Sequence, residues 1–264
     1  MKQRIVTAVV AAAIFLPIVL IGGLPFIFMV YLLASVGLYE TLRMQNIRLF
    51  SIPGLISLLL LWIFLIPSAH IGLLENINYS KFELALLAVL LFLTYTVITK
   101  NRFTFDNVAF SVLATLYVGI GFYYFIETRA AENGLTFVIY ALFIIWATDS
   151  GAYFIGRAMG KRKLWPEISP NKTVEGAFGG IICAIIVAII FALFTNIGVS
   201  LWALVLATAV LSVFGQVGDL VESALKRHYH VKDSGNILPG HGGILDRFDS
   251  LLFVLPLIHF LNLL

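Results

Sequence analysis

The sequence predicts an all-α, polytopic integral membrane protein with about nine transmembrane helices and a cytoplasmic N-terminus. Three observations support this prediction. Of the 264 residues, 61% are hydrophobic and only 12% are charged, whereas soluble domains are about half apolar and about a quarter charged. The apolar residues form runs of the length that a bilayer requires, about 20 residues. The basic residues gather in alternate connections between these runs.

Nine apolar segments are candidate transmembrane helices. The first follows Lys2 and Arg4 and resembles a signal peptide, but no small-x-small cleavage site follows it, so we expect it to remain as a span. Gly22 and Gly23 separate it from the second segment, with which it could form a tight hairpin. The last segment is short. In order, the segments are residues 5–21, 24–39, 52–67, 82–99, 108–126, 135–154, 174–197, 199–219 and 251–264.

The basic residues predict the orientation, because cytoplasmic loops retain Lys and Arg. With the N-terminus inside, 15 of the 17 basic residues lie on the cytoplasmic side, and only Lys81 and Arg129 lie outside. The C-terminus is then outside, and both long polar connections, residues 150–172 and 220–250, are cytoplasmic. We therefore expect a multi-pass protein of the cell (inner) membrane whose active site faces the cytoplasm.

Composition excludes several other classes. No basic stripe interleaved with aromatic residues is present outside the apolar runs, so we expect no nucleic-acid partner. The lone cysteine, Cys183, can form neither an internal disulfide nor a cysteine-based zinc site. No internal repeat is evident, and an odd number of spans argues against inverted halves. We predict one integral membrane domain, residues 1–264, with N-terminal helices in 1–105 and catalytic helices and loops in 106–264.

A polar stripe marks the end of the eighth segment. Helical steps of four and three bring its members onto one face. Hydrogen bonding between helices would explain most of them, but an ionisable residue within or near a span is costly and usually functional, which favours a site at Asp219. The stripe comprises Ser212, Gln216, Asp219, Ser223 and Lys226.

A glycine-rich turn follows. Gly240, Gly242 and Gly243 surround His241, and backbone amides in such a turn can approach an anionic group closely. A tight turn that leads back into the membrane is the alternative. Asp246 and Asp249 come next, three residues apart and therefore on one face of a helix.

Paired carboxylates beside Lys and Arg are what a phosphate bridged by Mg²⁺ requires. A surface ion-pair cluster at a helix start is the alternative for Asp246 and Asp249.

A third polar region lies upstream. Asp149, Tyr153 and Arg157 recur at steps of four, while Gly156 and Gly160 allow close helix contact.

Ser169 and Pro170 have the pattern of a helix N-cap followed by its first residue. Lys172 and Thr173 at such a helix start could bind an anion, although capping alone would also explain the pattern.

Together these residues resemble the phosphatidate cytidylyltransferases, or CDP-diacylglycerol synthases. The matching residues are Ser223, Lys226-Arg227, Lys232-Asp233, His241-Gly242-Gly243 and Asp246-Arg247-Phe248-Asp249. Residues 149–153 and 169–176 also resemble the family, with Asn171 where Lys is commonest. The resemblance covers the C-terminal half, whereas residues 1–105 match only in being membrane-spanning.

The resemblance implies an enzyme of phospholipid biosynthesis, a nucleotidyltransferase that transfers a cytidylyl group from CTP to phosphatidate and yields CDP-diacylglycerol and pyrophosphate. It also implies membrane lipids as partners and suggests a homodimer. The attacking phosphate is already ionised, so no general base is needed, and catalysis can depend on Mg²⁺, positioning and charge neutralisation.

We assign roles to the motif residues on this basis. Asp219, Lys226, Arg227 and Asp246 are the predicted catalytic residues. Asp219, Asp246 and Asp249 are the predicted Mg²⁺ ligands. The predicted phosphatidate-binding residues are Lys232, His241 and Arg247. The predicted nucleotide-binding residues are Asp149, Ser169, Lys172, Thr173 and Glu175, and Ser223 is expected to bind substrate.

Two other functions fit the sequence less well. A CDP-alcohol phosphotransferase or polyprenyl transferase needs denser aspartate motifs than the single pair Asp246 and Asp249. A transporter of a phosphorylated solute predicts ionisable residues near the middle of several spans, whereas the charged residues here lie at one end.

Overall fold

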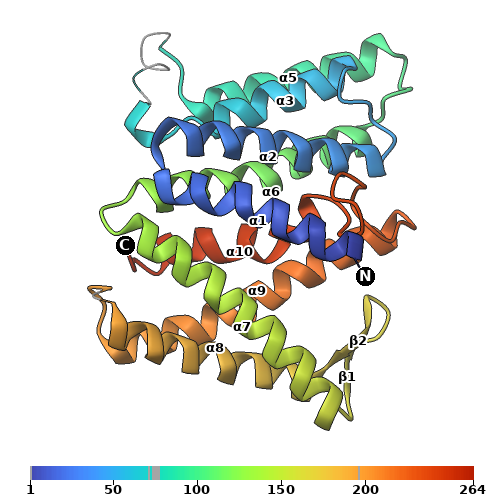
Figure 1. Cartoon of the computed structure of the whole chain (residues 1–264). Helices are drawn as coiled ribbons and strands as arrows, with labels where there is room; N and C mark the ends of the chain where they lie inside the picture. The colour runs from blue at the N-terminus through green and yellow to red at the C-terminus, as the bar shows by residue number, and fades with distance from the viewer. Residues whose placement is uncertain (1, 71, 73–77, 196) are drawn as a thin grey trace. The chain divides into compact units, whose positions relative to one another are not determined.

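The computed structural model describes residues 2–70, 72, 78–195 and 197–264. Within these residues it contains nine α-helices, one short 3-10 helix and one two-stranded hairpin (Figure 1). The elements are α1 (Lys2–Ile21), α2 (Gly23–Met44), α3 (Ile52–Phe64), η1 (Ser68–His70), α5 (Lys81–Ile98), α6 (Phe105–Ala130), α7 (Gly134–Met159), β1 (Lys163–Trp165), β2 (Ser169–Thr173), α8 (Val174–Phe194), α9 (Leu201–His228) and α10 (Leu245–Phe260).

Each predicted span overlaps one of these α-helices. Six of the described helices are long and apolar enough to cross a membrane, namely α2, α5, α6, α7, α8 and α9. Two further apolar helices, Ile5–Ile21 and Ile52–Phe64, are shorter. The all-α polytopic fold is therefore confirmed, while the number of spans and the side of the N-terminus stay predictions.

The surface of α8 shows why a membrane is required. Its mean hydropathy is 2.9, yet only 22% of its apolar window is buried inside the protein. Leu193 and Phe194 near its end are 75% and 84% exposed. Because a helix satisfies its own backbone hydrogen bonds, such an apolar surface is stable against lipid.

The chain forms two compact units. The first comprises Met1–Glu127 and Asp233–Leu245. In it, α1 packs against α2, α2 against α3, and α3 against α5 (Figure 1). The inner face of α2 carries Phe26, Val30, Ala34 and Leu38, at steps of four and at most 1% exposed. This helical spacing places one continuous apolar row in the core of the unit.

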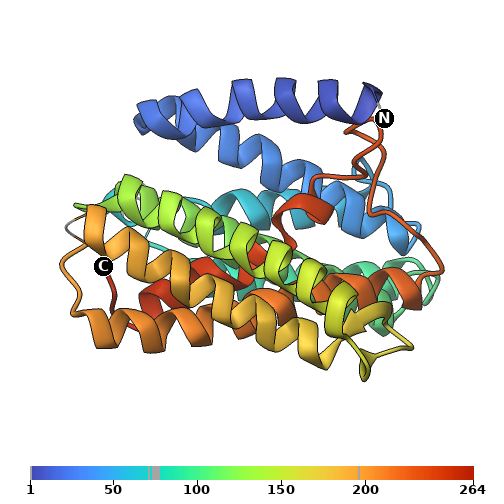
Figure 2. The ribbon, with the colours of Figure 1, turned by 60° about the horizontal axis from the view of Figure 1, so that its bottom comes forward.

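The second unit comprises Thr128–Lys232 and Asp246–Leu264. Its helices α7, α8 and α9 lie side by side in both views (Figures 1 and 2). Antiparallel strands β1 and β2 connect α7 to α8. Two buried hydroxyl contacts join α7 to α9: Tyr140 to Thr208 at 2.6 Å and Thr148 to Ser212 at 2.8 Å. The sequence left open whether Ser212 belongs to a functional site or makes a hydrogen bond between helices, and the structure shows the hydrogen bond.

The predicted helix start at Ser169 is wrong. Ser169–Thr173 is strand β2, and α8 begins at Val174. Pro170 is accommodated because an edge strand tolerates a residue without a backbone N–H. Thr173 is the N-cap, and its Oγ1 accepts a hydrogen bond from the Gly176 N–H at 3.1 Å. The residues that precede α8 are extended because they pair with β1.

Glycines bring α7 and α8 into close contact. A Cβ added at Gly179 of α8 would lie 2.7 Å from the Cβ of Ile155, and one at Gly151 of α7 would lie 2.7 Å from the Cys183 Sγ. A Cβ at Gly156 would lie 2.9 Å from the Thr173 Oγ1. Small residues at such positions let two membrane helices approach each other.

Gly179→Ala is expected to destabilise the protein, since the new methyl group overlaps the Ile155 Cβ and the two helices must move apart. Overpacking of this kind costs about 1–3 kcal/mol. The control is Gly37→Ala, because a Cβ there meets Val118 and Phe122 only at 3.6 and 3.8 Å. Thermal unfolding in detergent should show a lower midpoint for Gly179→Ala alone. Equal midpoints for both variants would contradict the proposed close packing.

Candidate active site

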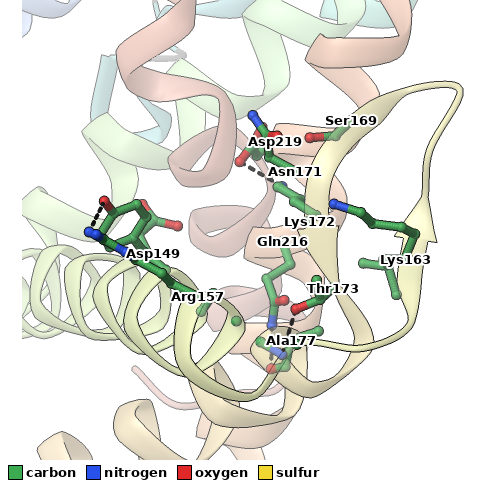
Figure 3. A pocket seen from close by; sticks show the side chains of 16 residues that line it. Asp149, Arg157, Lys163, Ser169, Asn171, Lys172, Thr173, Ala177, Gln216 and Asp219 are labelled. Carbon is green, nitrogen blue, oxygen red and sulfur yellow. Dashed lines mark hydrogen bonds and ion pairs between the residues drawn. The ribbon is translucent and has the colours of Figure 1, made fainter.

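Five of the predicted site residues, Asp149, Ser169, Lys172, Thr173 and Asp219, line one polar pocket in the second unit. Its volume is about 630 Å³, within the range of about 300–1,000 Å³ that is usual for ligand pockets. Figure 3 shows the side chains of the hairpin facing those of α9 across it. The lining residues are Asp149, Ala152, Tyr153, Gly156, Arg157, Gly160, Lys163, Leu164, Ser169, Asn171, Lys172, Thr173, Gly176, Ala177, Gln216 and Asp219.

The α7 wall follows from helical periodicity. Asp149, Tyr153 and Arg157 line the pocket together, as their spacing of four predicts. The Arg157 Nη1 donates to the Tyr153 hydroxyl at 3.3 Å. This bond orients the Arg157 guanidinium in the wall of the pocket.

The hairpin wall is held by Glu175. Its carboxylate accepts hydrogen bonds from the backbone N–H groups of Lys161, at 3.0 Å, and Arg162, at 3.2 Å. These bonds join the segment before β1 to the first turn of α8. Glu175 does not line the described pocket, so its contacts support a structural role in the hairpin wall, and its predicted role in nucleotide binding stays a prediction.

Two of the lining residues, Lys172 and Asp219, form an ion pair. The Lys172 Nζ lies 2.6 Å from the Asp219 Oδ2, and both side chains are about one-third exposed or less. Figure 3 shows the two side chains meeting inside the pocket. The Ser223 Oγ donates to the Asp219 Oδ1 at 3.3 Å, and the Gln216 Nε2 donates to the Ala177 carbonyl at 3.3 Å. The polar stripe of α9 thus contributes Gln216 and Asp219 to the pocket wall, whereas Ser212 makes a hydrogen bond between two helices.

The charges of the lining residues favour an anionic ligand. Arg157, Lys163 and Lys172 contribute three positive charges, and Asp149 and Asp219 contribute two negative ones. One positive charge is therefore in excess before any ligand binds. A pocket of this kind attracts a polyphosphate through its electrostatic potential.

A buried charge cluster joins the last turns of α9 to Asp246 of α10. The Lys226 Nζ forms ion pairs with the Asp246 Oδ1, at 2.6 Å, and with the Glu222 carboxylate. The Glu222 side chain is fully buried. Sequence reasoning did not identify Glu222, although its position four residues before Lys226 is the spacing of a helical ion pair.

Asp246 lies in the first turn of α10, which begins at Leu245, and Asp249 follows it three residues later on the same helix, so the prediction that the two share one helical face is confirmed. Burial raises the pKa of Asp249 to about 7, and the negative charges of Asp219 and then Asp149 contribute further. The three carboxylates are thus close enough to repel one another. Hard carboxylate oxygens are the ligands that Mg²⁺ prefers, so this set is chemically suited to a divalent cation.

The predicted ligand set Asp219, Asp246 and Asp249 is not assembled as one group. Among the described residues, no three His, Cys, Asp or Glu side chains lie together in a metal-binding arrangement. Asp219 instead pairs with Lys172, and Asp246 pairs with Lys226. The assignment of these residues to Mg²⁺ stays a prediction.

The remaining predicted residues lie elsewhere. The Arg227 Nε donates to the Ile168 carbonyl in the hairpin turn at 3.3 Å. Arg247 is exposed but lies close enough to Asp149 for their charges to interact. Lys232 is exposed at the end of the second unit. His241 belongs to the first unit, where its ring Nδ1 is buried, and its predicted role stays a prediction.

Comparison with known proteins identifies relatives over the whole chain. The model of the Cytidylyltransferase family matches residues 2–264. The chain is 61% identical over 262 residues to a phosphatidate cytidylyltransferase of Bacillus subtilis (strain 168), covering 99% of this chain and 97% of the relative. The enzyme of the same name from Staphylococcus haemolyticus (strain JCSC1435) is 52% identical over 261 residues, covering 99% and 98%. That of Staphylococcus aureus (strain COL) is 50% identical with the same coverage.

Proposed function

Since the chain belongs to the cytidylyltransferase family, we propose that it transfers the cytidylyl group of CTP to phosphatidate and releases pyrophosphate. It is an enzyme, a nucleotidyltransferase. The observation that carries the proposal is the polar pocket around Lys172 and Asp219, in a chain 61% identical to a phosphatidate cytidylyltransferase. An excess of positive charge and a volume of about 630 Å³ suit a nucleoside triphosphate.

The reaction needs positioning more than proton transfer. An oxygen of the phosphatidate phosphate forms a bond to the α-phosphorus of CTP, and the bond to the bridging oxygen breaks, so pyrophosphate leaves with the electron pair. The nucleophile is already ionised, so no general base is required. Lys172 and Lys163 would bind and orient the triphosphate, and Lys226 and Arg227 would neutralise charge that develops on the leaving group.

Asp219, Asp246 and Asp249 stay the predicted Mg²⁺ ligands, and Asp149 lies close enough to Asp219 and Asp249 for their charges to interact. When bound, Mg²⁺ neutralises phosphate charge and acts as a Lewis acid. The mutual repulsion of these carboxylates supports the assignment, because a divalent cation would relieve it.

An apolar groove beside the pocket supports a lipid substrate. It shares Leu164, Ala177 and Gln216 with the polar pocket. Its other lining residues are Trp165, Val174, Phe178, Ile181, Val213, Val217 and Leu220. A phosphate headgroup could therefore enter the polar pocket while apolar chains stay against α8 and α9. The distribution of basic residues supports a pocket that opens to the cytoplasm, and a homodimer stays a prediction.

The test is the fate of two phosphorus labels. Purified protein is incubated with phosphatidate, Mg²⁺ and CTP labelled either at the α- or at the γ-phosphate. We expect the α-label to enter the lipid phase and the γ-label to remain in water as pyrophosphate, with no transfer when Mg²⁺ is chelated. A γ-label in the lipid would indicate a kinase, and no label in the lipid would overturn the proposal.

Lys172→Met is expected to raise the KM for CTP by about 10- to 100-fold, because a charge-assisted hydrogen bond contributes about 1.5–3 kcal/mol. The matched control is Lys161→Met, which removes the same charge from an exposed position that does not line the pocket. Steady-state kinetics with varied CTP should separate the two. A KM raised equally by both variants would contradict a specific contact at Lys172.

A further inference from the structure

A buried carboxylate lies near the C-terminal end of α2, far from every motif in the sequence. Glu40 is only 1% exposed. An ionised side chain at such a position is costly unless hydrogen bonds satisfy it. Glu40 belongs to no pattern that sequence reasoning identified. Its surroundings therefore indicate why a carboxylate is kept there.

Three donors from one distant segment reach Glu40. The backbone N–H of Ile244 donates to its Oε1 at 3.0 Å, and that of Leu245 donates to its Oε2 at 2.9 Å. The Ser234 hydroxyl donates to the Oε2 at 3.2 Å. The segment and α2 belong to the same compact unit. One side chain thus joins positions about 200 residues apart in the sequence.

Two glycines of the same segment make room for this side chain. A Cβ added at Gly235 or at Gly243 would overlap the Glu40 carboxyl group. The sequence predicted that the glycine-rich turn accommodates an anionic group close to its backbone. The structure shows such a group beside Gly243, and this group is the carboxylate of Glu40 in the same chain.

Glu40 acts on the start of α10. This helix begins at Leu245, whose N–H is among the first donors that an α-helix leaves without an internal partner. A carboxylate at this place also interacts favourably with the helix dipole. The residues that follow Leu245 directly are Asp246, Arg247, Phe248 and Asp249.

We propose that Glu40 is a positioning residue for cytidylyl transfer, which anchors the first turn of α10 and thereby places Asp246, Arg247 and Asp249. This inference rests on the proposed function, because it takes these three residues to act in the reaction. Glu40 need not touch either substrate. Its effect passes through the backbone of Ile244 and Leu245.

Glu40→Gln tests the anchor at nearly constant volume. The amide nitrogen cannot accept a hydrogen bond, so at least one of the three donors loses its acceptor. We expect kcat to fall by about 100-fold, since displacing a catalytic group by about 1 Å has an effect of this size. The KM for CTP should change little, because the pocket residues lie on α7, the hairpin, α8 and α9.

A second readout follows the anchor directly. Hydrogen exchange at the Ile244 and Leu245 amides should be faster in Glu40→Gln. Glu40→Asp keeps the charge and should recover part of kcat and of the protection. Ser234→Ala removes one donor and should lower kcat by only a few-fold. If Glu40→Gln does not fold, Glu40→Asp and Ser234→Ala test whether Glu40 positions the first turn of α10.

The matched control is Thr41→Val. Thr41 is equally buried, but its Oγ1 donates to the Gly37 carbonyl of its own helix. Thr41→Val should leave kcat and hydrogen exchange at the Ile244 and Leu245 amides unchanged.

Unchanged kcat in Glu40→Gln, or lower kcat with unchanged exchange at Ile244 and Leu245, would overturn the inference. Absence of lipid labelling by the unsubstituted protein is a different outcome, which overturns the proposed function and the inference with it.

Discussion

Asp219→Asn is expected to lower the rate of cytidylyl transfer by at least about 1,000-fold, the loss typical when a main electrostatic group of a site is removed. Asp219 pairs with Lys172 at 2.6 Å and accepts a hydrogen bond from Ser223. Its charge also acts on Asp149 and Asp249. Substitution therefore removes the group on which the pocket and the proposed Mg²⁺ site both depend.

The measurement is single-turnover transfer of the α-label from CTP to lipid. Asp106→Asn is the control, because it makes the same chemical change at an exposed position on the first turn of α6. It should retain full activity and should have the same unfolding midpoint. If Asp219→Asn kept more than a tenth of the native rate, the assignment of Asp219 to the catalytic centre would be wrong.

Lys226→Met is expected to abolish most activity and also to destabilise the fold by about 3–5 kcal/mol, the cost of leaving a buried charge without its partner. The Lys226 Nζ pairs with Glu222 and Asp246, whose side chains are 0% and 6% exposed. Removal of the ammonium group leaves two carboxylates facing each other in a buried place. The loss of stability is therefore separate from the loss of catalysis.

A double variant distinguishes the two effects. In Lys226→Met with Glu222→Gln, one of the two unpaired carboxylates becomes neutral, so much of the stability should return. Activity should stay low, since the cation next to Asp246 is still missing. Unfolding in mixed detergent and the label-transfer assay measure the two quantities independently. Recovery of activity in the double variant would show that Lys226 has only a structural role.

Much of the site was predictable where the signal is local. Asp149, Tyr153 and Arg157 share a face of α7, and Asp219 and Ser223 share a face of α9, because helical period alone determines which residues of a helix lie together. Asp246 and Asp249 were predicted in the same way. The order of these motifs along the chain also predicted the family, which the comparisons confirm.

Contacts between distant segments were not predictable. The pair Lys172 and Asp219 joins a strand to α9, and Lys226 reaches Asp246 across 20 residues. The extended conformation at Ser169 depends on pairing with β1, which overrides the local capping pattern. Glu222 and Glu40 carry no motif, so only their burial and partners reveal them.

The sequence by itself determined the all-α membrane fold, because lipid cannot satisfy backbone hydrogen bonds and apolar runs must therefore form helices. It also determined which residue types the site contains. Only the tertiary structure decided which charges neutralise one another and which glycines make room for Glu40. The physical reason is that an ion pair or a buried hydrogen bond requires two groups within about 3 Å, and chain order alone does not specify that distance.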